Sequence, residues 1–160
     1  MEYFEICALL PQSIPALSTD LDRTHTTLFA SFHPTTVDFT MSAPTNYVYK
    51  ILSSSPPLPI PRTFTPVDAS DGFVHLSSGA QVPATASRFF GSETKIWLVK
   101  IDLKKLENGP GEVKWEESMK HGVFAHLYGA DIEEQAVVSV DEKTRMGEEG
   151  WEEILKGLEE

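Results

Sequence analysis

Cysteine, basic residues and long apolar runs are all scarce in this sequence of 160 residues. The one cysteine, Cys7, has no disulfide partner within the chain, and no cysteines and histidines are grouped at zinc-binding spacing. No apolar run approaches the ~18 residues that a membrane-spanning helix needs. The N-terminal stretch begins acidic, with Glu2 and Glu5 at positions where an export signal is basic. These absences predict a cytoplasmic protein in a reducing compartment, with no bound metal and no membrane partner.

Positive charge is in short supply, with 13 lysines and arginines against 24 acidic residues and a formal net charge of −11. A chain of this charge repels a phosphate backbone, so we expect no nucleic acid to bind through a basic surface. One small anionic ligand is still compatible with the charge, because a single arginine acts locally. The common dinucleotide, phosphate-loop, zinc-protease and hydrolase motifs are absent as well.

The sequence changes character near residue 45. Residues 1–45 contain one basic residue, Arg23, many threonines, serines and prolines, and no sustained period of a helix or a strand. We predict that residues 1–45 are a disordered extension and that residues 46–160 form a single domain. Two explanations of the extension stay open: a genuine flexible tail, or an upstream start that precedes the authentic one at Met41.

Residues 46–160 contain more short strand patterns than helical ones, and no strand–helix rhythm repeats along them. This favours an α+β domain. The patterns predict strands at 47–52, 73–77, 96–101, 113–115, 123–128 and 135–140. They predict a helix at 80–90, one helical turn at 103–106 and a short amphipathic helix over 151–158. Five prolines predict irregular structure over 53–66.

Two of the predicted strands carry a histidine in line with an aromatic residue. By strand alternation His75 shares a face with Phe73 and Ser77, and His126 shares a face with Tyr128. Imidazole and hydroxyl groups bind sugar oxygens, and aromatic faces stack on flat rings, so a cleft between these strands could hold a nucleoside. The alternative is that both histidines only tie strands together at a sheet edge.

Other polar residues have a functional and a plainer interpretation. Arg88, among apolar neighbours on the predicted helix, could reach a phosphate with both guanidinium arms, or simply extend along the helix face. Glu116, after Trp115, could act as a base or stabilise a developing cation, whereas Glu117 is better explained as an exposed glutamate. His121 lies in a predicted loop and is expected to be solvated.

A series of motifs resembles a known family. In order they read DGFVHLS at 71–77, QV at 81–82, RFF at 88–90, WLV at 97–99, KWE at 114–116 and FAHLYG at 124–129. This series, over about residues 46–140, is similar to domain-of-unknown-function family 952. The chain departs from the family pattern at Ala125 and Glu117, where the family has proline, which relaxes the backbone beside His126 and Glu116. It also has Lys50 in a strand where some relatives carry a histidine.

The resemblance implies a small mixed or split β-sheet with few short helices, similar to a minimal ADP-ribosyltransferase domain whose relatives bind NAD between half-sheets. A shared fold does not by itself give a function. Taken with the strand pattern, the resemblance points to His75, Glu116 and His126 as catalytic residues. The substrate-binding residues that we predict are Phe73, Ser77, Arg88, Trp115 and Tyr128.

Three hypotheses of function follow. In the first, the protein is an enzyme that transfers ADP-ribose from NAD, with Glu116 stabilising the cationic transition state. In the second, the same cleft binds NAD or a related nucleotide without catalysis. In the third, the domain is structural or mediates interactions, and the histidines have no ligand. The sequence leaves the acceptor, the oligomeric state and the biological process open.

Overall fold

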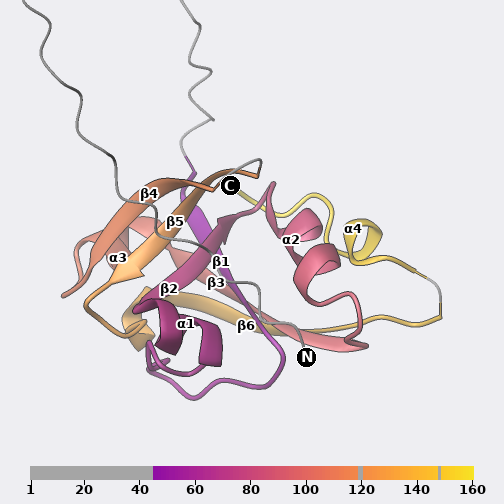
Figure 1. Cartoon of the computed structure of the whole chain (residues 1–160), viewed down its shortest axis with the longest axis horizontal. Helices are drawn as coiled ribbons and strands as arrows, with labels where there is room; N and C mark the ends of the chain where they lie inside the picture. The colour runs from indigo at the N-terminus through magenta and orange to yellow at the C-terminus, as the bar shows by residue number, and fades with distance from the viewer. Residues whose placement is uncertain (1–44, 119–120, 148) are drawn as a thin grey trace, which may run out of the picture. The chain divides into compact units, whose positions relative to one another are not determined.

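The computed structural model describes residues 45–118, 121–147 and 149–160, and the predicted extension over 1–45 therefore lies almost wholly outside the described residues. Six strands and several short helices follow one another along the chain (Figure 1). The strands are β1 (Tyr47–Leu52), β2 (Phe73–Ser78), β3 (Lys95–Asp102), β4 (Glu112–Ser118), β5 (Gly122–Tyr128) and β6 (Val137–Thr144). The helices are α1 (Pro66–Asp71), α2 (Val82–Phe89), α3 (Leu103–Glu107), α4 (Trp151–Ile154) and the 3-10 turn η1 (Glu134–Ala136).

The strands form one sheet in the order β4-β5-β2-β1-β3-β6. Every strand pairing among the described residues is antiparallel, so the α+β class is confirmed, while the sheet is antiparallel rather than mixed. The two halves of the sheet meet weakly, because β1 and β2 pair only at Val48 with Ser78 and Tyr49 with Ser77. Beyond these pairs β1 and β2 diverge, which leaves a wedge between them.

Two apolar clusters pack on opposite faces of the sheet. The first joins both halves, through Val48 and Leu52 of β1, Val74 and Leu76 of β2 and Leu127 of β5, and it is covered by α3 and η1. In the second, α2 and α4 pack on β1 and β3, and none of its members comes from β4 or β5. Figure 1 shows α2 and α4 next to each other, away from β4, and α1 reaches this side of β2 through Asp68 and Asp71, which contact the His75 ring.

The predicted elements differ from the observed ones at three places. Helix α1 was not predicted, although Thr65 caps its first turn, Pro66 begins it and Gly72 ends it at a φ of 79°. The predicted C-terminal helix is shorter than expected, because α4 ends at Ile154 and Gly157 adopts a φ of 77°. The last strand begins later than predicted, at Val137, after the η1 turn.

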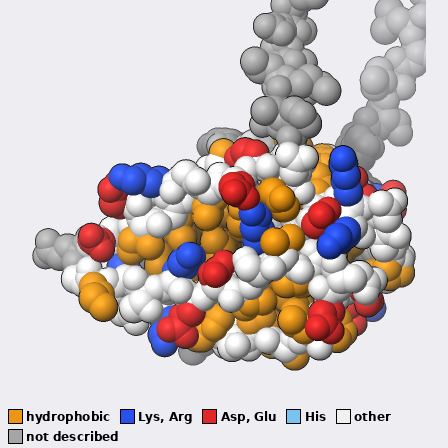
Figure 2. All heavy atoms as spheres, turned by 180° about the vertical axis from the view of Figure 1, so that it is seen from behind, with side chains coloured by type: hydrophobic (Ala, Val, Ile, Leu, Met, Phe, Trp, Pro, Cys, Tyr) orange, Lys and Arg blue, Asp and Glu red, His pale blue; other side chains and the backbone are white. Residues whose placement is uncertain are grey.

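The opposite side of the molecule shows no separation of charge by sign. Figure 2 shows acidic and basic side chains interspersed among apolar ones over this face. Among the described residues, no helix combines the length and the apolar character needed to cross a membrane.

Candidate functional site

The two histidines singled out in the sequence lie side by side. Strands β2 and β5 are neighbours, and in their register His75 is directly opposite His126. Their ring centroids are 5.2 Å apart, with an edge-on angle of 72°. Facing residues of an antiparallel pair have their side chains in contact, so the register alone brings these imidazoles together.

Phe73 packs against three rings at the centre of this group. Its ring centroid lies 4.7 Å from that of His75, 4.4 Å from that of His126 and 4.9 Å from that of Tyr128. The next strand, β4, brings Glu116 and Lys114 alongside β5. We call this surface the histidine face, and define it by Asp71, Phe73, His75, Glu112, Lys114, Glu116, His126 and Tyr128.

The first imidazole is held by a buried carboxylate. His75 donates from Nδ1 to Asp68 Oδ1 over 2.8 Å, and its backbone amide donates to the same oxygen over 3.0 Å. Asp68 comes from α1, where Thr65 caps the helix and also donates its hydroxyl to Asp68 Oδ2 over 2.6 Å. Lys50, from β1 across the wedge, lies 2.6 Å from Oδ2. A four-member network of Lys50, Asp68, Thr65 and His75 therefore fills the space where β1 and β2 diverge.

Charge balance keeps the buried carboxylate ionised. Burial by itself raises the pKa of Asp68, but the hydrogen bond from His75 and the charge of Lys50 outweigh it and hold this pKa at about 2. Burial lowers the pKa of Lys50, and the Asp68 carboxylate opposes that effect. An ionised carboxylate only accepts hydrogen bonds, so Nδ1 of His75 carries the proton. The other ring nitrogen, Nε2, lies 3.3 Å from Asp71 Oδ2 on the partly exposed side.

The second imidazole has an exposed carboxylate partner. His126 donates from Nδ1 to Glu116 Oε2 over 2.6 Å, and the Tyr128 hydroxyl donates to the same oxygen over 2.8 Å. The bond from His126, then that from Tyr128, lowers the pKa of Glu116. Burial, followed by the Glu116 carboxylate, raises the pKa of Tyr128 to about 12. Glu116 is thus a carboxylate with Oε1 outside both bonds, and Tyr128 is a neutral donor.

The two histidine–carboxylate pairs differ in exposure. In the first pair the His75 side chain is 34% exposed and that of its partner Asp68 is 2% exposed. In the second pair the His126 side chain is 13% exposed and that of Glu116 is 43% exposed. The His75 ring is therefore held by a buried carboxylate, and the His126 ring is held by a carboxylate that is open to solvent. Chemically, such a surface offers two ring nitrogens and a carboxylate for hydrogen bonding, proton transfer or stabilisation of a cation.

Comparison with known proteins adds a family. The model of the family described as "Protein of unknown function (DUF952)" matches residues 60–140, which is just over half of the chain. The chain belongs to the DUF952 family. The matched residues include both histidine-bearing strands and Glu116 of this DUF952 protein.

Two solved structures are similar to the DUF952 chain. Both are crystal structures of protein CC0527 from Caulobacter crescentus, one of them of a double mutant, with 28% and 25% sequence identity. Each has a TM-score of 0.48 and covers 60% of this chain and 84% of the other. No curated protein matches the sequence.

Of the eight predicted site residues of the DUF952 protein, the structure brings five together. They are Phe73, His75, Glu116, His126 and Tyr128. Ser77 lies on the same strand face but is only 5% exposed, and it pairs with Tyr49 of β1. The roles that we assign to these residues stay predictions.

The structure does not place the other two with the histidine face. Trp115 precedes Glu116 in β4, so alternation turns it to the opposite face, where it lies across from Ala125. Arg88 is exposed on α2, and among the contacts described for it is that of its guanidinium with the Phe89 ring, 5.9 Å from the centroid. Trp115 therefore lies on the other side of β4 from Glu116, and Arg88 has no described contact with the histidine pair. That Trp115 and Arg88 bind a substrate stays a prediction.

Sequence reasoning missed the two charged residues beneath His75, Lys50 and Asp68, and three charged residues of the histidine face, Asp71, Glu112 and Lys114. Asp71 and Asp68 lie four and seven residues before His75, and the Thr65-Pro66 pair is a helix-start signal that would have placed both carboxylates on α1. Lys50 is a lone charge in an otherwise apolar strand, which signals a buried ion pair.

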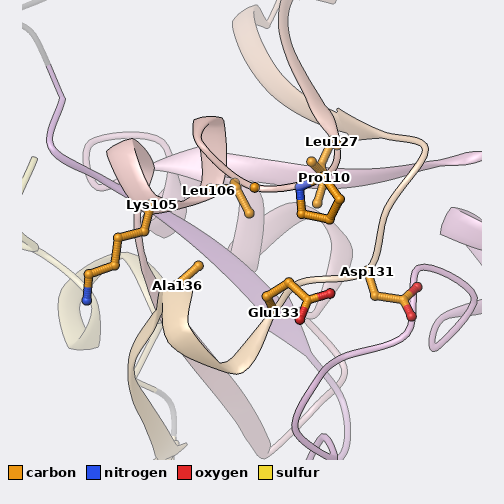
Figure 3. A pocket seen from close by; sticks show the side chains of 9 residues that line it. Lys105, Leu106, Pro110, Leu127, Asp131, Glu133 and Ala136 are labelled. Atoms are coloured by element: carbon orange, nitrogen blue, oxygen red, sulfur yellow. The ribbon is translucent and has the colours of Figure 1, made fainter.

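Two hollows among the described residues lie away from the predicted cleft between the histidine strands. One cavity, with room for about one water molecule, lies beside Leu106, Pro110, Leu127, Asp131 and Glu133 (Figure 3). Leu127 alternates with His126, so this cavity is on the other side of the sheet. A second hollow lies between Pro83 of α2 and the C-terminal residues 156–160. Neither is lined by His75 or His126.

The low pKa of Asp68 predicts an acid-sensitive fold. A carboxyl group whose pKa falls from 3.8 to about 2 on folding stabilises the folded state above pH 4, and this contribution is lost as the pH falls through 2. We expect a loss of about 2 kcal/mol in the free energy of unfolding between pH 5 and pH 2 from this group. Urea unfolding followed by circular dichroism across that range measures it.

The control for this loss of stability at low pH is the Asp68→Asn variant, which has no carboxyl group to titrate at position 68. Its deficit in stability relative to the wild type should shrink as the pH falls from 5 to 2. A deficit that stays the same at all these pH values would show that the Asp68 carboxyl group does not titrate at the depressed pKa.

Proposed function

We propose that the histidine face binds NAD or a related nucleotide and transfers its ADP-ribose group. The observation that carries the proposal is the adjacent His75–His126 pair, 5.2 Å apart, with the Nδ1 atom of each ring held by a carboxylate. This arrangement leaves Nε2 of His126 for a ribose hydroxyl, whereas Nε2 of His75 lies 3.3 Å from Asp71 Oδ2. Glu116 lies in the same group, within hydrogen-bonding distance of His126.

The transfer reaction needs a negative group that gains strength as charge develops. The bond between the ribose C1′ and the nicotinamide nitrogen breaks, its electron pair leaves with neutral nicotinamide, and C1′ becomes cationic. The ionised Glu116 stabilises that cation, because the carboxylate attracts the positive charge at C1′ more strongly in the transition state than in the bound substrate. The acceptor oxygen, of water or a hydroxyl, then forms the new bond to C1′, and its proton passes to an imidazole.

A second candidate is binding without turnover. It is favoured by one observation: Oε2 of Glu116 is already occupied by both His126 and Tyr128. A carboxylate used to orient an imidazole and a phenol serves recognition as well as catalysis. In that case His75, His126 and Tyr128 hold the nucleotide and nicotinamide is not released.

The test combines ligand-induced stabilisation with product release on the purified full chain. NAD should raise the melting temperature of the wild type, because a ligand that binds only the folded state stabilises it by mass action. The rise should be lost in His75→Ala and His126→Ala. His121→Ala is the matched control: His121 is exposed, outside the histidine face, and the variant should respond as the wild type does.

Release of nicotinamide, measured by chromatography, separates the two candidates. Glu116→Gln should keep the thermal shift and lose release by about 10²-fold or more if the carboxylate stabilises the transition state. If NAD raises the melting temperature of the wild type but no nicotinamide is released, the protein binds the nucleotide without catalysis. A shift that survives in both histidine variants, or no shift with NAD, would overturn the proposed site.

A further inference from the structure

Strand β4 forms one edge of the sheet, and its outer side has no partner strand among the described residues. Figure 1 shows β4 at this edge, beside β5. The unpaired amide and carbonyl groups of an edge strand can pair with a strand of another chain. Which strand fits is decided by the side chains that would face one another across the new pair. In β4 the exposed ones are Glu112, Lys114, Trp115 and Glu117.

A second copy of the chain can pair with β4 about a two-fold axis perpendicular to the sheet. Such an axis places one residue opposite its own copy, and residues at equal distances on either side of it face each other. Both copies then turn the same face of the sheet to the same side. Trp115 is the central residue of β4, so a pair centred on it uses the whole strand, Glu112–Ser118.

The pair centred on Trp115 brings opposite charges together. Lys114 lies opposite Glu116 of the second copy, and the symmetry forms this contact twice. Moving the centre by one residue sets Lys114 opposite itself in one direction and Glu116 opposite itself in the other. Like charges that face each other directly destabilise a strand pair, so the charges of β4 favour one register over its two neighbours.

Both charged side chains can form the new contact at little cost. Lys114 is 44% exposed, and its ion pair with the exposed Glu112, at 3.3 Å, contributes little to stability. Glu116 is 43% exposed and accepts from both His126 and Tyr128 at Oε2. Its other oxygen can therefore accept a lysine of the second copy while both hydrogen bonds are kept.

The opposite face of β4 adds an aromatic contact at the axis. Trp115 is 41% exposed, and Val123, which lies diagonally across from it on the same face of β5, is 43% exposed. In the centred register the two copies of Trp115 face each other, and facing aromatic residues stabilise a strand pair. Pairing therefore covers apolar surface on this face and joins opposite charges on the other.

The other edge strand, β6, lacks this match. Its two central two-fold registers are centred on Val140 and Asp141. Neither sets a lysine opposite a carboxylate, and the second sets Asp141 opposite itself. The register of β6 with β3 also shifts between Lys100 and Ile101, and an irregularity of this kind protects an edge strand from pairing.

We propose that the DUF952 protein forms a two-fold homodimer in which the β4 strands of two copies pair antiparallel, centred on Trp115. The two sheets become one continuous sheet, and both histidine faces lie on the same side of it. Each copy supplies Lys114 to the Glu116 carboxylate of the other, so the second copy contributes a cation to the candidate site. The inference does not depend on which ligand the histidine face binds.

Sedimentation equilibrium of the purified full chain measures the dimer, over protein concentrations from about 1 µM to about 1 mM. The wild type should show a monomer–dimer equilibrium. Lys114→Glu and Glu116→Lys should each weaken dimerisation about tenfold or more, because each sets like charges opposite one another at two positions. Trp115→Ala should weaken it about threefold or more, because the aromatic contact is lost.

A mixture of the two charge variants tests the register. In a mixed pair the glutamate introduced at position 114 faces the lysine introduced at position 116, and the native Glu116 of one chain faces the native Lys114 of the other. The mixture should therefore form a heterodimer about as tightly as the wild type dimerises, while each variant alone does so poorly. The matched control is Lys143→Glu, the same change on β6, which should leave the affinity unchanged. Circular dichroism checks that each variant is folded.

Three results would overturn the proposal. The first is a wild type that stays monomeric up to about 1 mM. The second is a dimer that Lys143→Glu dissociates and Lys114→Glu does not, because its interface would lie at β6. The third is an unchanged affinity in Trp115→Ala, or folded charge variants whose mixture does not associate, because the register would then be wrong. None of these measurements uses NAD, so a failure of the dimer is distinct from a failure of the proposed function.

Discussion

Replacement of Asp68 by asparagine is expected to lower the free energy of unfolding by about 3–5 kcal/mol. The side chain is 2% exposed and lies 2.6 Å from the Lys50 ammonium, which is itself 7% exposed. Asparagine keeps the shape but removes the negative charge, so a buried cation is left without its partner. The His75 ring and the Thr65 cap lose a charged acceptor as well. Urea unfolding at pH 7 measures the loss.

Two controls connect this loss with the buried charge. Asp71→Asn removes the other carboxylate near His75, but this side chain is 34% exposed, so we expect a change within about 0.5 kcal/mol. Adding Lys50→Met to Asp68→Asn removes the stranded cation and should recover part of the stability. A double variant less stable than Asp68→Asn alone would show that the uncompensated lysine is not the cause.

Replacement of Trp151 by alanine is the second large effect, also about 3–5 kcal/mol. Trp151 is 1% exposed and belongs to the apolar cluster in which α2 and α4 cover β1 and β3. Its indole nitrogen donates to the Phe90 carbonyl over 2.8 Å, where α2 ends. Truncation leaves a cavity and an unpaired carbonyl, because α4 has only one turn with which to repack. Chemical denaturation of the purified variant provides the measurement.

The matched control is Phe89→Ala, an aromatic-to-alanine change on the adjacent α2. Phe89 is 68% exposed, so its removal should cost no more than about 0.5 kcal/mol. Trp151→Phe should lie between the two, since it keeps most of the apolar volume and loses the hydrogen bond. Equal losses for Trp151→Ala and Phe89→Ala would contradict the role of Trp151 as the anchor of α4.

The strands of this protein were largely predictable, and so were the aromatic and imidazole rings of the histidine face. Alternation within 73–78 and 122–128 places His75 with Phe73 and His126 with Tyr128, whatever the fold. That β2 and β5 are neighbours did not follow from the pattern. The partners His75 and His126 are far apart in the sequence, and only the assembled sheet sets their register.

The network beneath His75 was harder to predict, because it depends on a short helix and on a gap in the sheet. A helix of six residues gives almost no periodic signal, so Asp68 was not assigned to an element. The side of β4 on which Trp115 lies was not considered either. The motif around it was taken as one unit, although adjacent residues of a strand face opposite ways, and Glu116 alone reaches His126.

The wedge between β1 and β2 has a consequence for communication within the molecule. Where two strands are fully paired, amide–carbonyl bonds join them and carry no net charge. Here the join beyond Tyr49 and Ser77 is made by Lys50 and Asp68, and Asp68 Oδ1 also accepts the Nδ1 proton of His75. The hydrogen bond of His75 and the ion pair of Lys50 therefore share one carboxylate. The two halves of the sheet are coupled electrically at the point where their backbones part.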